Sequence, residues 1–167
     1  AKAISADLSN ELNEATLFAD DGQAESVKEF KSGTLSLGID DIGNDAAAAL
    51  VGARLDQNGV LVSSGEDVCR YVAIGFRAKK ANGKYKYYWL YRVLFGVPAT
   101  NLATKGDSIT FSTPTIEGTI FTKKKVDGAN KHLWKAEVTE SDSNTAIIST
   151  WYDSVYEPTY QTNGGDN

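Results

Sequence analysis

The sequence has little of the chemistry that enzymes and metal sites need. It contains one cysteine, one histidine and no methionine among 167 residues. A single cysteine cannot form a disulfide within the chain, so no disulfide framework indicates secretion. Neither His132 nor Cys69 has sequence neighbours that would complete a catalytic triad or a zinc site, and we interpret both as structural residues. No glycine-rich phosphate loop is present. We therefore expect neither enzymatic activity nor a cofactor.

Long apolar runs are also missing. No stretch approaches the roughly 20 residues that a membrane-spanning helix needs, and we recognise no signal peptide. We therefore expect no membrane association. The sequence does not begin with methionine, which fits a start inside a longer gene product, and a segment preceding Ala1 is left open.

Charge of one sign is scarce in each part of the chain. Residues 1–67 carry 13 acidic and 4 basic side chains, residues 68–137 carry 4 acidic and 13 basic, and residues 138–167 carry 5 acidic and none basic. Two interpretations are open. The charges either belong to solvated loops, or they form acidic and basic surfaces that meet when copies of the chain assemble.

The clearest local pattern is a hairpin over residues 72–95. Residues 72–79 alternate in polarity, Asn82-Gly83 is typical of a tight turn, and residues 84–95 are rich in aromatic and β-branched side chains. A two-residue turn places Ala78 opposite Tyr87 and Phe76 opposite Trp89. The same register places Ile74 opposite Tyr91 and Val72 opposite Val93. This aromatic side is the predicted core, with the basic side facing solvent or a partner.

The remaining elements are short. Strands are predicted at residues 3–8, 15–18, 27–39, 108–112, 115–125, 132–139 and 146–152, with a turn at 10–13. One helix is predicted over residues 46–51, capped by Asn44 or Asp45 and ended by Gly52. This pattern predicts a mainly β fold, an antiparallel β-sandwich or barrel with one short flanking α-helix. We expect a single domain over residues 1–160 and a flexible polar tail over 161–167.

Several of these features occur in a characteristic order. They are Ala19-Asp20-Asp21-Gly22, Gly33-Thr34-Leu35-Ser36-Leu37, Leu50-Val51-Gly52, Asp56-Gln57-Asn58-Gly59-Val60-Leu61-Val62, Tyr87-Tyr88-Trp89-Leu90-Tyr91 and Lys105-Gly106-Asp107-Ser108-Ile109-Thr110. Together they resemble the major tail tube protein of phages with long non-contractile tails, in siphophages and prophages of Gram-positive bacteria. The resemblance spans most of residues 14–122, and the leading strand of the family's pattern is absent.

The resemblance implies a structural subunit without enzymatic activity. Such subunits form hexameric rings that stack into the tube through which the genome is ejected. The implied partners are other copies of the chain, tape-measure and tail-terminator proteins, and duplex DNA that passes without specific binding. The implied location is the tail of the virion, after synthesis in the cytoplasm of the bacterial host.

Two sets of site residues follow from this hypothesis. Subunit contacts are predicted at the apolar centre of the 55–67 loop and at a lysine cluster: Val60, Leu61, Val62, Lys79, Lys80 and Lys84. A basic wall would hold a duplex that carries one negative charge per about 1.7 Å, so we predict an acidic lumen. The lumen candidates are Glu25, Glu29, Asp40, Asp41 and Glu117. Lys123, Lys124 and Lys125 are expected outside the lumen.

The alternative hypothesis is a carbohydrate- or peptide-binding β-sandwich module. Its aromatic platform would consist of Tyr85, Tyr87, Tyr88, Trp89 and Tyr91. Electron microscopy distinguishes the two hypotheses, because rings or tubes support the first and a glycan-retaining monomer supports the second.

Overall fold

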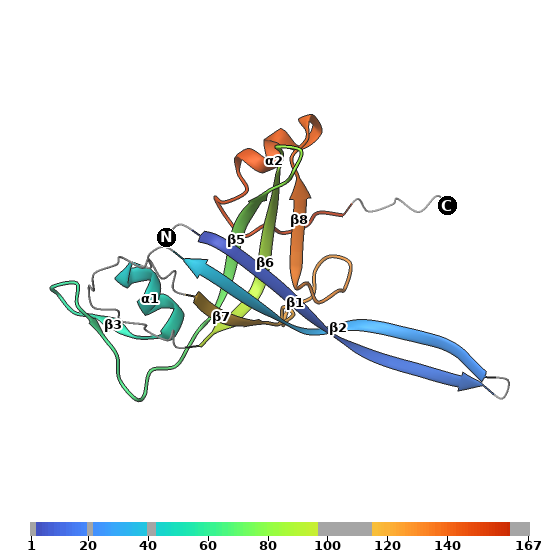
Figure 1. Cartoon of the computed structure of the whole chain (residues 1–167), viewed down its shortest axis with the longest axis horizontal. Helices are drawn as coiled ribbons and strands as arrows, with labels where there is room; N and C mark the ends of the chain where they lie inside the picture. The colour runs from blue at the N-terminus through green and yellow to red at the C-terminus, as the bar shows by residue number, and fades with distance from the viewer. Residues whose placement is uncertain (1–2, 20–21, 40–42, 97–114, 161–167) are drawn as a thin grey trace, which may run out of the picture. The chain divides into compact units, whose positions relative to one another are not determined.

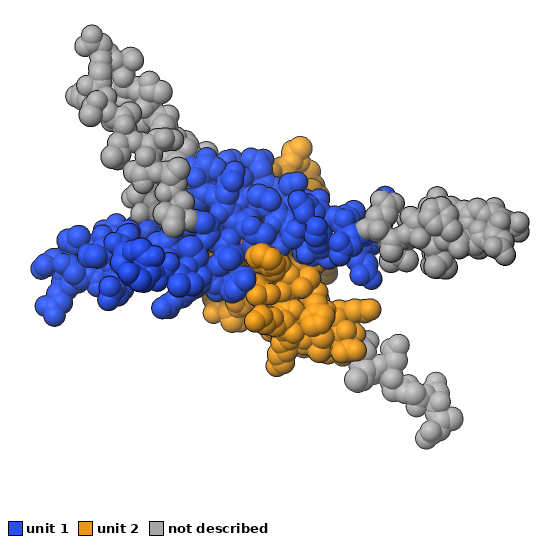
Figure 2. All heavy atoms as spheres, turned by 90° about the horizontal axis from the view of Figure 1, so that it is seen from below, with its two compact units in different colours: residues 1–71, 94–120 blue, residues 72–93, 121–167 orange. Residues whose placement is uncertain are grey.

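The computed structural model describes residues 3–19, 22–39, 43–96 and 115–160, without the side chains of residues 3–4, 14–19, 22–27 and 39. The chain forms two compact units, shown in Figure 2. Unit 1 consists of Ala1–Tyr71 and Leu94–Ile120, and unit 2 of Val72–Val93 and Phe121–Asn167. The predicted mainly antiparallel β fold is confirmed by the strands within each unit.

A three-stranded antiparallel arrangement forms the sheet of unit 1. Strand β1 (Ala3–Ala19) pairs with β2 (Gly22–Ile39), which pairs with β7 (Thr115–Ile120) (Figure 1). The prediction of a turn at residues 10–13 is wrong, because these residues lie within β1. The register shifts between Glu11 and Leu12, where β2 has one more residue than β1, and β1 continues past this irregularity. The connection at residues 20–21 and the predicted strand at 108–112 lie outside the described residues.

Alternating side chains form the core of unit 1. Leu35 and Leu37 of β2 are buried, and so are Ile116 and Ile120 of β7. Exposed threonines and Glu117 occupy the positions between them on β7. The predicted period-two pattern of both strands is confirmed, because a strand with one buried face needs apolar side chains at every second position.

Helix α1 (Asn44–Val51) also lies in unit 1, and its predicted position and end are confirmed. Gly52 ends it in the left-handed conformation, with φ of 78°, and donates its N–H to the Ala48 carbonyl. The predicted side-chain cap is wrong. The N-cap is Gly43, and the Asn44 amide instead donates to the Gly59 carbonyl at 3.1 Å. This bond joins the helix to the hairpin of β3 (Arg54–Leu55) and β4 (Leu61–Val62).

Three strands run through unit 2. Strand β6 (Tyr85–Phe95) pairs with β5 (Tyr71–Lys79) along one edge and with β8 (Lys135–Thr139) along the other (Figure 1). Strand β8 begins three residues later than the predicted strand at 132–139. His132 lies before it and places its ring Nδ1 2.8 Å from the Lys123 carbonyl, across the hairpin.

Three hairpin turns in the chain share one geometry. The turns lie at residues 56–60, 80–84 and 127–131. In each, the N–H of the first residue donates to the carbonyl of the fifth residue, and the N–H of the fourth residue donates to the carbonyl of the first. The fourth residue has positive φ in each turn, and it is Gly59, Gly83 or Asn130. This is a three-residue loop with a bulge rather than the predicted two-residue turn.

The additional loop residue shifts the pairing of β5 and β6 by one position. Because Lys80 lies opposite Lys84, Phe76 stacks on Tyr88 with ring centroids 5.0 Å apart. Gly75 instead lies against the Trp89 ring. The predicted pairs Phe76–Trp89, Ala78–Tyr87, Ile74–Tyr91 and Val72–Val93 are therefore wrong. Trp89 itself is buried, as the aromatic core prediction requires.

An aromatic cluster of Tyr87, Trp89 and Trp151 forms the core of unit 2. The Trp89 indole N–H donates to the Trp151 carbonyl at 2.9 Å. Trp151 follows α2 (Thr145–Ser149), a helix where the sequence predicts a strand over residues 146–152. The missed signal is the turn before it, since Ser141 and Asn144 form a capping box that starts helical structure.

Candidate functional site

The outer part of the β1–β2 hairpin forms a two-stranded arm, residues 11–19 and 22–32. Strand β7 pairs only with residues 33–38 of β2, so within the described structure the arm residues of β2 pair with β1 alone. Figure 1 shows the arm extending past the end of β7. An isolated two-stranded ribbon is marginally stable in water, and its unpaired edges offer N–H and C=O groups to another chain.

The described part of the arm carries an apolar cross-strand pair. Leu12 lies opposite Phe30 in the register, and 55% of Leu12 is exposed. The flanking Glu11 and Ser32 also lie opposite each other, and the Ser32 hydroxyl donates to the Glu11 carboxylate at 3.2 Å. An exposed leucine at the bulge of an unpaired ribbon is a feature that a second protein surface would bury.

One face of the unit 1 sheet is polar where β1, β2 and β7 are all paired, and its three described rows there contain no basic residue. Its cross-strand rows are Ser9–Thr34–Thr119, Asp7–Ser36–Glu117 and Ser5–Gly38–Thr115. The other face holds the buried leucines and isoleucines. The polar face therefore presents hydroxyls around two carboxylates, and a polyanion that approaches it finds no cation to bind.

The structure places the predicted lumen residues at different sites. Glu117 lies in the middle row of the polar face and is exposed. Glu29 is exposed on the arm, opposite Asn13, and the backbone of Glu25 lies farther out, opposite Leu17. Asp40 and Asp41 lie outside the described residues. Sequence reasoning missed Asp7, because its place in the row of Glu117 depends on two strand registers.

The predicted apolar contact residues lie on the β3–β4 hairpin of unit 1. Val60 and Val62 are 54% and 47% exposed, and Leu61 is half-buried. The turn is well defined, because the Asp56 carboxylate accepts the N–H groups of Asn58 and Val60, each at 2.8 Å. The bond from Val60 is the main cause that lowers the pKa of Asp56. Leu55 and Val68, which the prediction did not include, are also exposed.

The lysines of the second predicted contact lie in unit 2. Lys79, Lys80 and Lys84 are exposed around the β5–β6 turn. Unit 2 as a whole carries 11 basic and 7 acidic side chains, a net charge of +4, whereas unit 1 carries 6 basic and 15 acidic, a net charge of −9. The acidic first part of the sequence thus lies in unit 1, and most basic residues of the middle part lie in unit 2.

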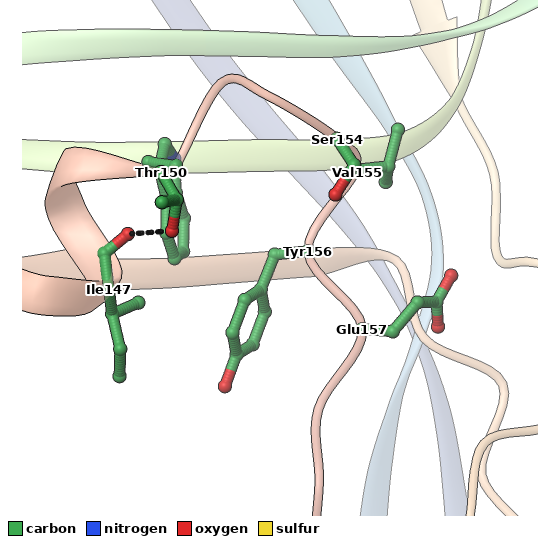
Figure 3. A pocket seen from close by; sticks show the side chains of 7 residues that line it. Ile147, Thr150, Ser154, Val155, Tyr156 and Glu157 are labelled. Carbon is green, nitrogen blue, oxygen red and sulfur yellow. Dashed lines mark hydrogen bonds between the residues drawn. The ribbon is translucent and has the colours of Figure 1, made fainter.

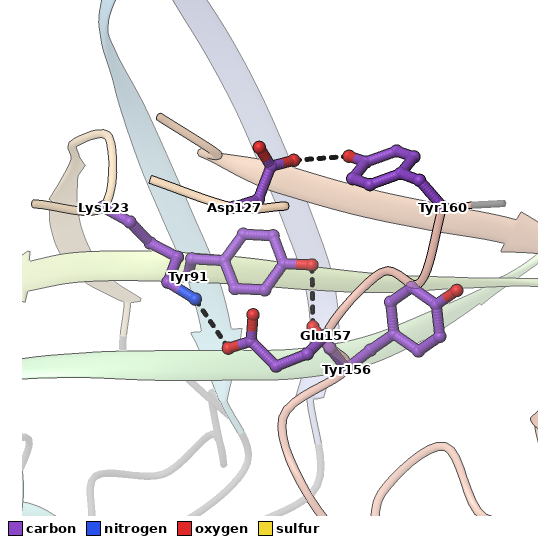
Figure 4. A network of polar contacts seen from close by, with 6 residues as sticks. All are labelled: Tyr91, Lys123, Asp127, Tyr156, Glu157 and Tyr160. Carbon is purple, nitrogen blue, oxygen red and sulfur yellow. Dashed lines mark hydrogen bonds and ion pairs between the residues drawn. The ribbon is translucent and has the colours of Figure 1, made fainter. Parts of the chain in front are cut away.

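Three side-chain contacts hold the C-terminal segment of unit 2 (Figure 4). The Tyr91 hydroxyl donates to the Tyr156 carbonyl at 2.8 Å, and the Lys123 ammonium lies 2.6 Å from the Glu157 carboxylate. The Tyr160 hydroxyl donates to the Asp127 carboxylate, and this bond lowers the pKa of Asp127. Burial, aided by the nearby Glu157 carboxylate, raises the pKa of Tyr91 to about 12.

A cavity of about 360 Å³ lies between α2 and this segment (Figure 3). Trp151 and six other residues line it: Ile147, Thr150, Ser154, Val155, Tyr156 and Glu157. None of these residues was predicted as a site, because α2 itself was predicted as a strand. The platform of the alternative hypothesis lies elsewhere, with Tyr87, Trp89 and Tyr91 buried and Tyr85 and Tyr88 half-buried.

The described residues contain neither a metal-binding cluster nor a membrane-spanning helix. No group of three or more histidine, cysteine, aspartate or glutamate side chains is placed to hold a metal ion. No helix in this part of the chain is long and apolar enough to cross a membrane. In comparisons of the sequence, no protein-family model matches it, and no curated protein matches it either.

Proposed function

We propose that this protein is a structural subunit that self-assembles into a tube, and that it is the major tail tube protein of a phage with a long non-contractile tail. The observation that carries the proposal is the two-stranded arm. Its strand edges and Leu12 are exposed in the single chain. Both would be satisfied by a neighbouring copy.

Charge supports contacts between copies. The acidic unit 1 and the basic unit 2 give one chain two surfaces of opposite sign. A contact that joins different surfaces of identical subunits closes into a ring or continues as a filament. The exposed Val60 and Val62 and the lysines at the β5–β6 turn are the proposed contact residues. Six copies in a ring, and rings stacked into the tube, follow from the family resemblance.

The polar face of unit 1 suits the wall of a DNA conduit. Duplex DNA is densely negative, and lysine or arginine side chains on the wall would release its counterions and bind it. The face rows around Asp7 and Glu117 contain hydroxyls and carboxylates only. A wall of this composition lets a duplex slide without being held. The resemblance adds tape-measure and tail-terminator proteins as partners and the virion tail as the location.

Electron microscopy of concentrated protein tests the assembly, with an arm-trimmed variant beside the wild type. In this variant Asn-Gly replaces residues 13–29, which removes the outer arm and leaves the β2–β7 pairing intact. We expect rings or tubes from the wild type, and a folded monomer with cooperative unfolding from the variant. Tubes of unchanged form from the trimmed variant would show that residues 13–29 of the arm are not the contact.

A charge-reversal pair tests the lumen in assembled tubes. The variant Asp7→Lys/Glu117→Lys places lysines on the polar face, and Asp45→Lys/Glu66→Lys makes the same charge change at exposed positions elsewhere in unit 1. We expect only the first pair to retain duplex DNA inside the tube, with retention that falls steeply as salt rises. Equal retention by both pairs would refute the assignment of this face to the lumen.

A further inference from the structure

The cavity beside α2 combines an apolar surface with polar groups that lack partners. The Trp151 side chain is 3% exposed, and its ring stacks on Tyr156 with centroids 5.0 Å apart. Ile147 and Val155 add apolar side chains that are more exposed. Figure 3 shows Ile147 and Tyr156 extending in the same direction from α2 and from the segment after it. An aromatic ring and aliphatic side chains of this kind bind the apolar face of a ligand.

Hydrogen-bonding capacity around this cavity is unused. The Trp151 indole N–H is buried and has no partner among the described residues. The indole nitrogen is itself enclosed, so a ligand in the cavity would contact the Trp151 ring rather than its N–H. In the same part of the structure, no bond joins the hydroxyls of Ser154 and Tyr156 to another residue. Thr150 donates its hydroxyl to helix carbonyls and keeps its lone pairs free.

The charges exclude two ligand classes. No basic residue lines the cavity, so it offers nothing to an anion. Its one carboxylate, Glu157, is already paired with Lys123 at 2.6 Å, so its attraction for a cation is largely compensated. A neutral ligand with both hydroxyl groups and an apolar face remains. The cavity volume of about 360 Å³ is near the lower end of the range for small-molecule sites, so the ligand has about one ring.

We propose that this cavity binds a neutral pyranose sugar. The sugar's apolar face lies against Tyr156 and Val155, and its hydroxyls pair with Ser154, Tyr156 and Glu157. This site is separate from the predicted β6 aromatic platform, and it does not depend on the proposed assembly, because all its residues belong to unit 2.

Indole N–H resonances test the proposal directly in the full chain labelled with ¹⁵N. The sequence contains three tryptophans, Trp89, Trp134 and Trp151, and single Trp→Phe variants assign their resonances. Methyl β-glucoside, methyl β-galactoside and N-acetylglucosamine are titrated to about 100 mM, which saturates a site of millimolar affinity. We expect a saturable shift of the Trp151 resonance with at least one sugar, while Trp134 stays unchanged.

Tyr156→Phe is the matched variant, because it removes a hydroxyl and keeps the ring that stacks on Trp151. Its backbone carbonyl still accepts the Tyr91 bond. We expect affinity to fall about tenfold. Tyr152→Phe, whose ring packs on Tyr87 and Trp89 but does not line the cavity, should leave affinity unchanged. Equal unfolding midpoints of the two variants would confirm that both are folded.

Three results would overturn the proposal: no Trp151 shift with any sugar, equal effects of Tyr156→Phe and Tyr152→Phe, or equal binding of n-hexanol, a neutral alcohol without the ring. A disaccharide that contains the binding sugar shows whether the site binds a free sugar or the end of a glycan. Tighter binding of the disaccharide assigns the site to the end of a glycan, and equal or weaker binding assigns it to a free sugar.

Discussion

The contact between Gly75 and Trp89 gives the sharpest test of the β5–β6 register. A Cβ added at Gly75 would lie 3.0 Å from the Cη2 and Cζ2 atoms of the Trp89 ring. Carbon atoms pack best at about 3.5–4.0 Å, and Trp89 is buried and tied by its N–H to the Trp151 carbonyl. The ring therefore has little room to retreat. We expect Gly75→Ala to lower the free energy of unfolding by about 1–3 kcal/mol through overpacking.

A double-mutant cycle shows whether the loss comes from this contact. Trp89→Phe removes the distal ring atoms that approach Gly75, so Gly75→Ala should be nearly neutral in the Trp89→Phe background. The expected coupling energy is about 1–2 kcal/mol. Urea unfolding followed by far-ultraviolet circular dichroism measures all four proteins. The control is Gly65→Ala, because a Cβ at Gly65 meets nothing within 4 Å.

The cycle distinguishes the observed register from the two-residue turn. With the two-residue turn, Phe76 and not Gly75 would lie opposite Trp89, and a methyl group at position 75 would not meet the indole. Equal losses from Gly75→Ala in both backgrounds, or no loss in either, would refute the argument.

Three further predictions follow from particular contacts. Gly52→Ala should lower the free energy of unfolding by about 2 kcal/mol more than Gly59→Ala in urea titrations, because both glycines have positive φ but only at Gly52 would a Cβ lie 2.2 Å from the Val68 carbonyl oxygen. The free energy of unfolding should fall as pH rises from 10 to 12, because the pKa of Tyr91 is raised to about 12 in the folded chain, so Tyr91 ionises in the unfolded chain at lower pH than in the folded chain. Tyr91→Phe should reduce this loss, as measured by urea unfolding midpoints across that pH range. Val60→Lys/Val62→Lys should abolish assembly, as measured by sedimentation velocity. The unfolding midpoint should stay unchanged, because both side chains are about half exposed in the single chain. Assembly of this variant at the wild-type concentration would contradict the contact assignment.

Local patterns in the sequence were sufficient for much of the fold. Leu35 and Leu37 are two residues apart in β2, and Ile116 and Ile120 are four apart in β7, so each pair lies on one face of its strand. This spacing predicts the buried faces, because it can be read from one strand without knowing its neighbours. Helix α1 and its end at Gly52 follow from local propensity and the need for a left-handed residue. The burial of Trp89 was predictable as well. Burial of a large aromatic side chain holds in either register.

Only the tertiary structure decided which residues meet. One additional residue in the 80–84 turn exchanges Phe76 for Gly75 opposite Trp89, and Asn-Gly is compatible with both turn lengths. Asp7 joins the row of Glu117 through two strand pairings, although the two residues lie far apart in sequence. Residues 146–149 are helical because a capped turn precedes them, and this places Trp151 in the core and beside the cavity. The turn length and the helix start are each decided over a few residues, where the alternatives differ little in local propensity, and the shared row depends on pairing between distant strands.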